Sequence, residues 1–203
     1  MRKTILIFVL AGLAGCATTA VSPALSHMDN VEIGPGPHGF QYVNKATYRF
    51  DGVSAIGEAL PICVVQNVQN KSVTLQDSST QKFLPYVGFV SNKSAREVGG
   101  GQVITYISDD KSTVLADGVT SYQPTGLIPI AQSVRFSLST KASADGLDAV
   151  FTNIDQAQVD TGVAANDGYT KLGAWPGQNP ELAIGELKKI ADSIAECVKA
   201  QQQ

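Results

Sequence analysis

Few residues in this 203-residue chain are able to perform nucleophilic or metal chemistry. Its histidines are His27 and His38, and its cysteines are Cys16, Cys63 and Cys197. A serine or cysteine nucleophile needs a base beside it, usually histidine, and the familiar zinc sites combine histidine with cysteine. Because no histidine follows His38, the sequence predicts no catalytic triad, no metal site and no cofactor in the body of the chain.

Three aspartates and three consecutive glycines come nearest to local motifs. Asp109 and Asp110 fall in a predicted turn, where aspartate is common because it hydrogen-bonds to the backbone, and Asp117 follows without EF-hand spacing. The glycines at 99–101 lack the lysine and helix start of a phosphate-binding loop, so they indicate a turn. None of these residues predicts a site.

Three other acids are candidates for paired hydrolytic chemistry. Asp148 and Asp155 lie near the ends of a predicted strand, and Glu58 lies on a predicted helix. Carboxylate-pair hydrolases hold two acids about 5 to 10 Å apart in a cleft. Most acids in this chain occur in turn-like or solvent-facing contexts, so we expect no such convergence and predict a protein that is not an enzyme.

Five aromatic residues are spread along the chain. They would suit a pocket between sheet and helix for a small ligand, but such residues more often belong to the core or to a sheet face. These residues are Tyr86, Phe89, Tyr106, Tyr122 and Trp175.

Composition limits the class of protein. Hydrophobic residues make up 43% of the chain and charged residues 16%, which is enough apolar material for one globular domain. The 15 lysines and arginines and the 18 acids are scattered, without a block of either sign. This pattern gives no support to a nucleic-acid partner.

The first sixteen residues have the features of an export signal. Arg2 and Lys3 give a positive start, Ile5–Leu13 is apolar, and the run ends in Leu-Ala-Gly-Cys at Cys16. Nine apolar residues are too few for a membrane-spanning helix, which needs about twenty. The ending resembles the lipobox of bacterial lipoproteins, in which the cysteine is lipidated and becomes the first mature residue. The alternative is an ordinary signal peptide cut elsewhere.

This resemblance implies a location. Lipoproteins without aspartate after the cysteine are usually sorted to the outer membrane, and Ala17 fits that rule. Lipidation at Cys16 implies a membrane anchor of two or three acyl chains, facing the periplasm. Loss of residues 1–15 leaves 13 basic against 18 acidic residues, a charge of −5. The signal peptide would therefore be 1–15, with a lipidated flexible tether over 16–39 and a single domain over 40–203. An ordered turn within 34–39 is the alternative for the end of the tether.

Apolar periodicity predicts the elements of the domain. Residues 42–50 alternate as a strand, and 54–68 carry a helical stripe that begins at Ser54 and is interrupted by Pro61. An alternative is a strand at 62–68 paired with 73–76. Residues 83–90 predict a further strand, with Pro85 indicating a sheet edge.

Two hairpins and a final helix follow. The hairpins are predicted at 103–108 with 113–122 and at 134–139 with 147–154. Residues 153–176 are expected to be irregular, with a short strand around 157–159 as an alternative. Asn179 and Pro180 start a helix whose apolar stripe includes Leu187, extended by Leu182. The predicted fold class is α+β, a curved antiparallel sheet covered by an N-terminal helix and a long C-terminal amphipathic helix.

Two thiols remain once Cys16 is lipidated. Cys63 and Cys197 each lie on the apolar side of a predicted element, and thiols pair in oxidising compartments. We therefore predict a disulfide between them.

The predicted function is that of a membrane-anchored, non-enzymatic envelope lipoprotein that contacts an envelope protein. The alternative is a binder of a small apolar or envelope-derived ligand in a pocket between sheet and helix. Protein contacts would require an exposed apolar patch or sheet edge, whereas ligand binding would require a concave cavity.

Overall fold

The computed structural model describes residues 20–54, 57–125 and 130–202, and it confirms the α+β class. One antiparallel sheet has the order β1-β2-β8-β7-β6-β5, with β9 added beside β8, and β3 and β4 form a separate two-stranded sheet. The strands are β1 Val31–Pro35, β2 Gln41–Asp51, β3 Ser72–Leu84, β4 Gly88–Gly99, β5 Ile104–Ile107, β6 Thr113–Tyr122, β7 Gln132–Ala142, β8 Gly146–Gln158 and β9 Thr170–Lys171. The helices are α1 Ala59–Asn67 and α2 Pro180–Ala200, with short 3-10 turns at Leu25–His27, Pro37–Gly39 and Pro176–Gln178.

The predicted strand and both predicted hairpins of the main sheet are confirmed. β2 covers the strand expected over 42–50, β5 pairs with β6, and β7 pairs with β8. Alternation decides which side chains face inward, since successive residues of a strand point to opposite faces. Val134, Phe136 and Leu138 of β7 are buried, while Arg135 between them is exposed.

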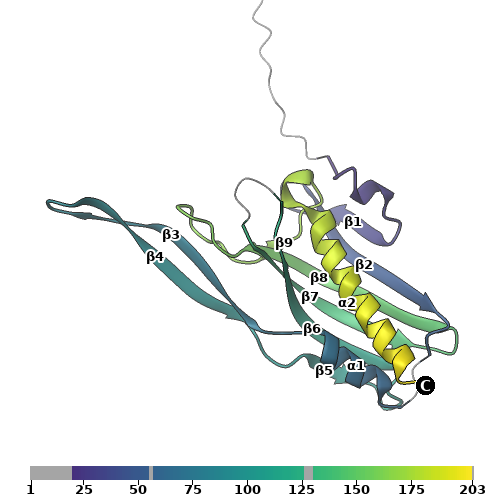
Figure 1. Ribbon diagram of the computed structural model, residues 1–203. Coiled ribbons are helices and arrows are strands. Elements are labelled where there is room, and N and C mark those ends of the chain that lie inside the picture. The colour runs from purple at the N-terminus through teal and green to yellow at the C-terminus, as the bar shows by residue number, and fades with distance from the viewer. Residues whose placement is uncertain (1–19, 55–56, 126–129, 203) are drawn as a thin grey trace, which may run out of the picture.

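Helix α2 packs across one face of the main sheet (Figure 1). It begins at Pro180 as predicted, because proline loses no helical hydrogen bond at the first position. Asn179 is the N-cap residue in a left-handed conformation, and its side chain makes no capping hydrogen bond. Leu187 is fully buried, but the expectation for Leu182 is wrong, since it remains 38% exposed.

Helix α1 is confirmed over the strand alternative for 62–68, but it begins later than expected. Its N-cap is Glu58, so the prediction that Ser54 starts it is wrong. Pro61 explains the shift, because it is the third residue of this helix. The first four N–H groups of a helix have no carbonyl partner within it, so a proline at that position, which lacks an N–H, loses no hydrogen bond. Between Ser54 and this helix, residues 55–56 lie outside the described part of the chain.

The expected tether is wrong for residues 22–39, which pack on the domain. β1 pairs with β2, Leu25 is buried, and the N–H of Ser22 donates to the carbonyl of Ala174 at 2.7 Å. Val31 and Ile33 supply partly buried contacts to the core. In the main sheet β1 pairs with β2 alone, so it is an edge strand. The folded domain therefore starts well before Phe40, whereas Cys16 lies outside the described residues.

The strand predicted at 83–90 is also wrong, because these residues contain the turn of a long hairpin. β3 ends at Leu84 and β4 begins at Gly88, so Pro85 marks the turn and not a sheet edge. This hairpin projects away from the main sheet (Figure 1).

In the segment predicted to be irregular, β8 continues to Gln158 and β9 follows at Thr170–Lys171.

The predicted disulfide joins α1 to α2. The Cα atoms of Cys63 and Cys197 are 5.6 Å apart, and Cys63 is fully buried. The two helices also pack on each other, so the bridge ties the short helix to the long one.

Candidate functional site

The base of the β3–β4 hairpin is braced by the loop that follows β8. The N–H of Gln76 donates to the carbonyl of Val159 at 2.8 Å, and the N–H of Thr161 donates back to the carbonyl of Gln76 at 3.1 Å. The Asn166 amide donates to the same Gln76 carbonyl at 3.1 Å, and Arg96 donates to the carbonyl of Asn166 at 3.1 Å. These contacts fix the direction in which the hairpin leaves the body.

The same loop holds an aspartate of β3. Asp77 accepts hydrogen bonds from the hydroxyl and backbone N–H of Ser79 at 2.6 and 3.0 Å and from the N–H of Asn166 at 3.2 Å. Bonds from Ser79, with a further one from Ser94, hold the pKa of the Asp77 carboxyl well below its ordinary value. Asp77 therefore stays ionised and keeps the brace closed at neutral pH.

The outer half of the hairpin has no such brace. Among the described residues, no backbone hydrogen bond from outside the hairpin reaches residues 80–92. The turn closes through the Val87 N–H, which donates to the Leu84 carbonyl at 3.1 Å, and it holds Tyr86 at a φ of 76°. Tyr86 is fully exposed, Val87 is 71% exposed and Leu84 is 45% exposed. The hairpin thus ends in an uncovered apolar tip, which we define as Leu84, Tyr86 and Val87.

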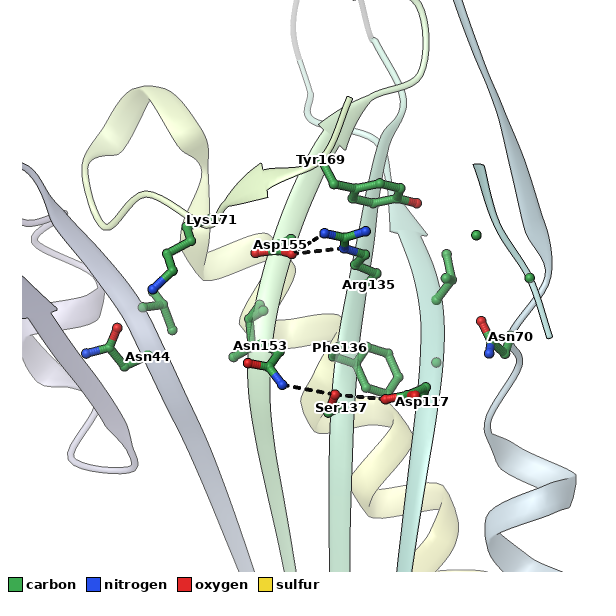
Figure 2. Close-up of a pocket in the computed structure, with 16 residues that line it drawn as sticks. Asn44, Asn70, Asp117, Arg135, Phe136, Ser137, Asn153, Asp155, Tyr169 and Lys171 are labelled. Carbon is green, nitrogen blue, oxygen red and sulfur yellow. Dashed lines mark hydrogen bonds and ion pairs between the residues drawn. The ribbon is translucent and has the colours of Figure 1, made fainter. Parts of the chain in front are cut away.

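A second feature is a groove of about 530 Å³ on the open face of the main sheet. Figure 2 shows its floor on β6, β7 and β8, with α2 behind the strands. Asp117, Ser137 and Asn153 lie side by side across these strands. The Ser137 hydroxyl donates to Asp117 Oδ1 at 2.8 Å, and the Asn153 amide donates to Ser137 Oγ at 3.2 Å. We call these three side chains the polar row.

An ion pair lies next to the polar row. Arg135 donates from Nε to Asp155 Oδ2 at 2.9 Å, and its guanidinium lies 4.8 Å from the centroid of the Tyr169 ring. The hydroxyls of Tyr169 and Ser133 are hydrogen-bonded at 2.6 Å. Burial raises the pKa of the Tyr169 phenol, so this hydroxyl keeps its proton at neutral pH. Lys171 lines the groove beside Asn44.

The structure keeps the three candidate acids apart. Asp148 accepts two hydrogen bonds from Arg49 at 3.0 and 3.1 Å, and Glu58 forms an ion pair with Lys111 at 3.6 Å. Asp155 belongs to the groove and is paired with an arginine of its own. Each acid thus has a different cationic partner: one on β2, one in the turn between β5 and β6, and one on β7.

One of the two aspartates of the predicted turn holds the turn through hydrogen bonds. Asp110 accepts hydrogen bonds from the hydroxyls of Ser108 and Ser112 at 2.6 and 2.8 Å. These bonds, with a further one from the Ser112 N–H, lower the Asp110 pKa to about 2. Asp109 is exposed, and Asp117 alone of the three lies in the groove. Gly99 ends β4, Gly100 and Gly101 follow it, and all three have a positive φ, as turn glycines do.

The five aromatic residues do not line one pocket. Tyr86 is at the hairpin tip, Phe89 lies on β4, and Tyr106 is 53% exposed on the edge strand β5. Tyr122 is buried and donates to Gln156 Oε1 at 2.9 Å. Trp175 packs against Phe40 and Tyr42 with ring centroids 5.1 and 5.7 Å away.

Sequence reasoning missed both surfaces. Asn153 and Ser137 belong to the groove only because β7 and β8 are paired, and single polar residues on a strand give no signal for such a site. The hairpin tip had one usable signal, the Leu-Pro-Tyr-Val-Gly run at 84–88, because a proline followed closely by a glycine, here three residues later, is typical of a turn.

Comparisons with known proteins add little. No protein-family model matches the chain, and no curated protein matches it. A solved structure of a DUF4468 family protein from Bacteroides ovatus is similar at a TM-score of 0.38 and 10% identity, covering 77% of this chain and 86% of that one. Within the described residues, no helix is both long and apolar enough to cross a bilayer, and no cluster of three metal-binding side chains occurs.

Proposed function

We propose that this protein is a non-enzymatic lipoprotein, anchored at Cys16 in the outer membrane on the periplasmic side, and that it contacts another envelope protein through the β3–β4 hairpin. The observation that carries the proposal is the uncovered apolar tip at the end of a braced, projecting hairpin. The anchor rests on the likeness of the first sixteen residues to a lipoprotein signal.

The position of the anchor gives the hairpin a reason to be long. Only five residues separate Cys16 from Ser22, which is already held on the domain, so the domain would lie within about 20 Å of its anchor. An arm of 13 residues, by contrast, spans about 40 Å. The hairpin would therefore extend the reach of a closely anchored domain.

The tip has the chemistry of a contact surface. A non-glycine residue at positive φ costs about 1 to 2 kcal/mol, and Tyr86 holds that conformation while exposing its whole ring. Exposed tyrosine supplies a large contact area at low entropic cost and is enriched in binding hot spots. A turn that presents Tyr86 to a partner would account for both the strained backbone and the exposed ring of this residue.

The backbone of the hairpin favours a protein partner over a bilayer. A two-stranded ribbon has two edges of unpaired N–H and C=O groups, and an isolated ribbon is marginal in water. Lipid tails offer these groups no hydrogen bonds, whereas a partner strand does, as in β-strand addition. The segment 80–93 also carries two lysines, Lys82 and Lys93, and no acid. We therefore expect the partner to offer a sheet edge and an acid-rimmed apolar pocket.

Site-specific photocrosslinking in cells tests this contact. A photoreactive residue replaces Tyr86 in the full chain, and the crosslinked peptide is identified by mass spectrometry. The matched control carries the same residue at Tyr106, another exposed tyrosine outside the hairpin. We expect one partner peptide from position 86 that is absent from position 106 and lost when Val87→Asp is added.

Two outcomes would contradict the proposed contact. Adducts with lipid alone would assign the tip to a membrane surface, and equal adducts from both positions would remove any special role for the hairpin. Tyr86→Gly tests whether a lost contact is due to unfolding. Glycine adopts a positive φ without steric cost, so this variant removes the tyrosine ring and keeps the turn. This variant should keep its melting temperature and lose the partner.

The anchor has a separate test. Cys16→Ser should release the protein from the membrane fraction in detergent phase separation, since the acyl chains supply the membrane affinity. If the substituted protein still partitions as a lipoprotein, its anchor is not at Cys16.

A further inference from the structure

Two β-bulges in the main sheet shape the groove on its open face. β2 carries an extra residue opposite β1 at Asn44, and β8 carries one opposite β7 at Asn153. Asn153 has a φ of 50°, which few residues other than glycine and asparagine adopt. Bulges commonly re-aim side chains near binding sites, and both of these residues line the same groove.

The polar row keeps hydrogen-bonding capacity for a ligand. Asp117 uses Oδ1 and Asn153 uses its amide nitrogen, while among the described residues nothing donates to Asp117 Oδ2 or to Asn153 Oδ1. Ser137 links the two as both donor and acceptor. The row therefore offers mainly acceptors to the groove, which suits a ligand that brings hydroxyl or amide donors.

The charges of the groove are balanced. Asp117 and Asp155 face Arg135 and Lys171, and Arg135 is already neutralised by Asp155 at 2.7 Å. Among the described residues that line the groove, Lys171 is the one cation that forms no ion pair, so an anion such as phosphate would meet a single unpaired positive charge. An apolar ligand would have to desolvate the polar row. Balanced charge with many hydrogen-bonding groups favours an uncharged polar ligand.

The asparagine side chains around the groove narrow the class of ligand further. Asn44 and Asn70 lie at opposite sides of the groove, and Asn153 lies between them on its floor. The Asn70 amide donates to the carbonyl of Gln102 at 2.9 Å, which leaves its oxygen as an acceptor. An asparagine amide both donates and accepts, so it pairs well with an acetamido group, which has the same two functions. The groove volume falls within the range of small-molecule sites.

We propose that this groove binds an uncharged oligosaccharide that carries acetamido groups, held by the polar row and by the asparagines around it. The inference stands apart from the hairpin contact, since it uses different side chains and a different face. Such a ligand could be a soluble glycan or part of the cell wall, and the two sources share this chemistry.

NMR titration of the chain beginning at Ala17, which keeps every described residue, tests the proposal. Chitotetraose, a neutral tetrasaccharide with acetamido groups, should shift amide signals of residues lining the groove and saturate below about 10 mM. Cellotetraose, which lacks acetamido groups, should bind at least tenfold more weakly, and so should the anionic tetragalacturonate. Cosedimentation with purified peptidoglycan then distinguishes a cell-wall source from a soluble glycan.

Substitutions connect binding to the polar row. Asn153→Gly keeps a residue that accepts positive φ and removes the amide, and Ser137→Ala removes the central hydroxyl. Each should weaken chitotetraose binding about tenfold, the effect of one or two lost hydrogen bonds. Asp148→Asn, on the same face of β8 but outside the groove, is the control and should bind normally.

Each remaining outcome would overturn the proposal in a defined way. Absence of saturation, or shifts that map away from the groove, would remove the site. Normal binding by both Asn153→Gly and Ser137→Ala would show that the polar row is not involved. Equal binding of cellotetraose would exclude recognition of the acetamido group, and tighter binding of tetragalacturonate would exclude an uncharged ligand.

Discussion

The disulfide between α1 and α2 should supply a large part of the stability of this domain. The perturbation is the double substitution Cys63→Ala and Cys197→Ala, which removes the bridge and leaves both helices in place. The bridge spans 134 residues of chain. For a loop of that size, the chain-entropy model gives about 5 kcal/mol, which is an upper value because real unfolded chains are already compact.

The structure adds a local reason for this effect. Helix α1 has only nine residues, too few to be stable alone in water, and its bridge to α2 is anchored at a fully buried Cys63. We therefore expect the free energy of unfolding to fall by about 3 to 5 kcal/mol. With a urea m-value of about 2 kcal/mol/M, the midpoint should fall by about 1.5 to 2.5 M.

Urea denaturation followed by circular dichroism measures this shift. Reduction of the native protein with dithiothreitol should reproduce most of the loss, because it breaks the bridge while keeping both sulfur atoms in place. The double variant should not respond to dithiothreitol. Ile62→Ala, at an exposed position of the same helix, is the matched control and should change stability by less than about 0.5 kcal/mol.

The reasoning would be refuted if the double variant unfolded within 0.3 M, roughly the error of such a midpoint comparison, of the native protein. It would also be refuted if protein taken directly from the cell envelope had alkylatable thiols at both Cys63 and Cys197. In that case the two cysteines would be buried thiols, and the stability of α1 would come from packing alone.

Two further predictions concern the core and the response to acid. Leu187→Ala should cost about 2 to 5 kcal/mol in thermal or urea unfolding because Leu187 is fully buried on α2, whereas Leu182→Ala on the same helix should cost far less. The folded-state pKa of Asp110 is about 2, below the ordinary value of about 3.9, because Ser108 and Ser112 donate to its carboxylate. Its contribution to stability is thus complete above pH 4 and is lost as the pH falls toward 2, so Asp110→Asn should be less stable than the native protein at pH 6 and should differ least from it at pH 2.

Local patterns predicted the elements that bury one face. β6, β7 and β8 alternate apolar and polar residues because one side of the sheet packs on α2, and the stripe through Leu187 follows the helical period for the same reason. Cys63 and Cys197 were paired from their number and their apolar positions. The strands and the helix needed only neighbours in sequence and the requirement that apolar side chains leave water, and the disulfide needed only the number of cysteines left to pair.

The elements that failed have no such local signal. β3 and β4 are polar over most of their length, so the chain shows no clear alternation there, although Leu75 near the base of the hairpin is buried. The segment at 31–35 was taken for part of a tether because an edge strand of five residues with a glycine and a proline has too few apolar positions to be recognised. Only its pairing with β2 makes it a strand.

The sequence by itself determined the α+β class, the final helix and the bridge, because each depends on a continuous run of residues or on a count. The tertiary structure decided the direction of the hairpin, since that depends on hydrogen bonds between Gln76 and the loop after β8. It also decided the groove, where Asp117, Ser137 and Asn153 meet across three strands. Contacts between residues 16 to 36 positions apart arise from strand pairing, which no local pattern encodes.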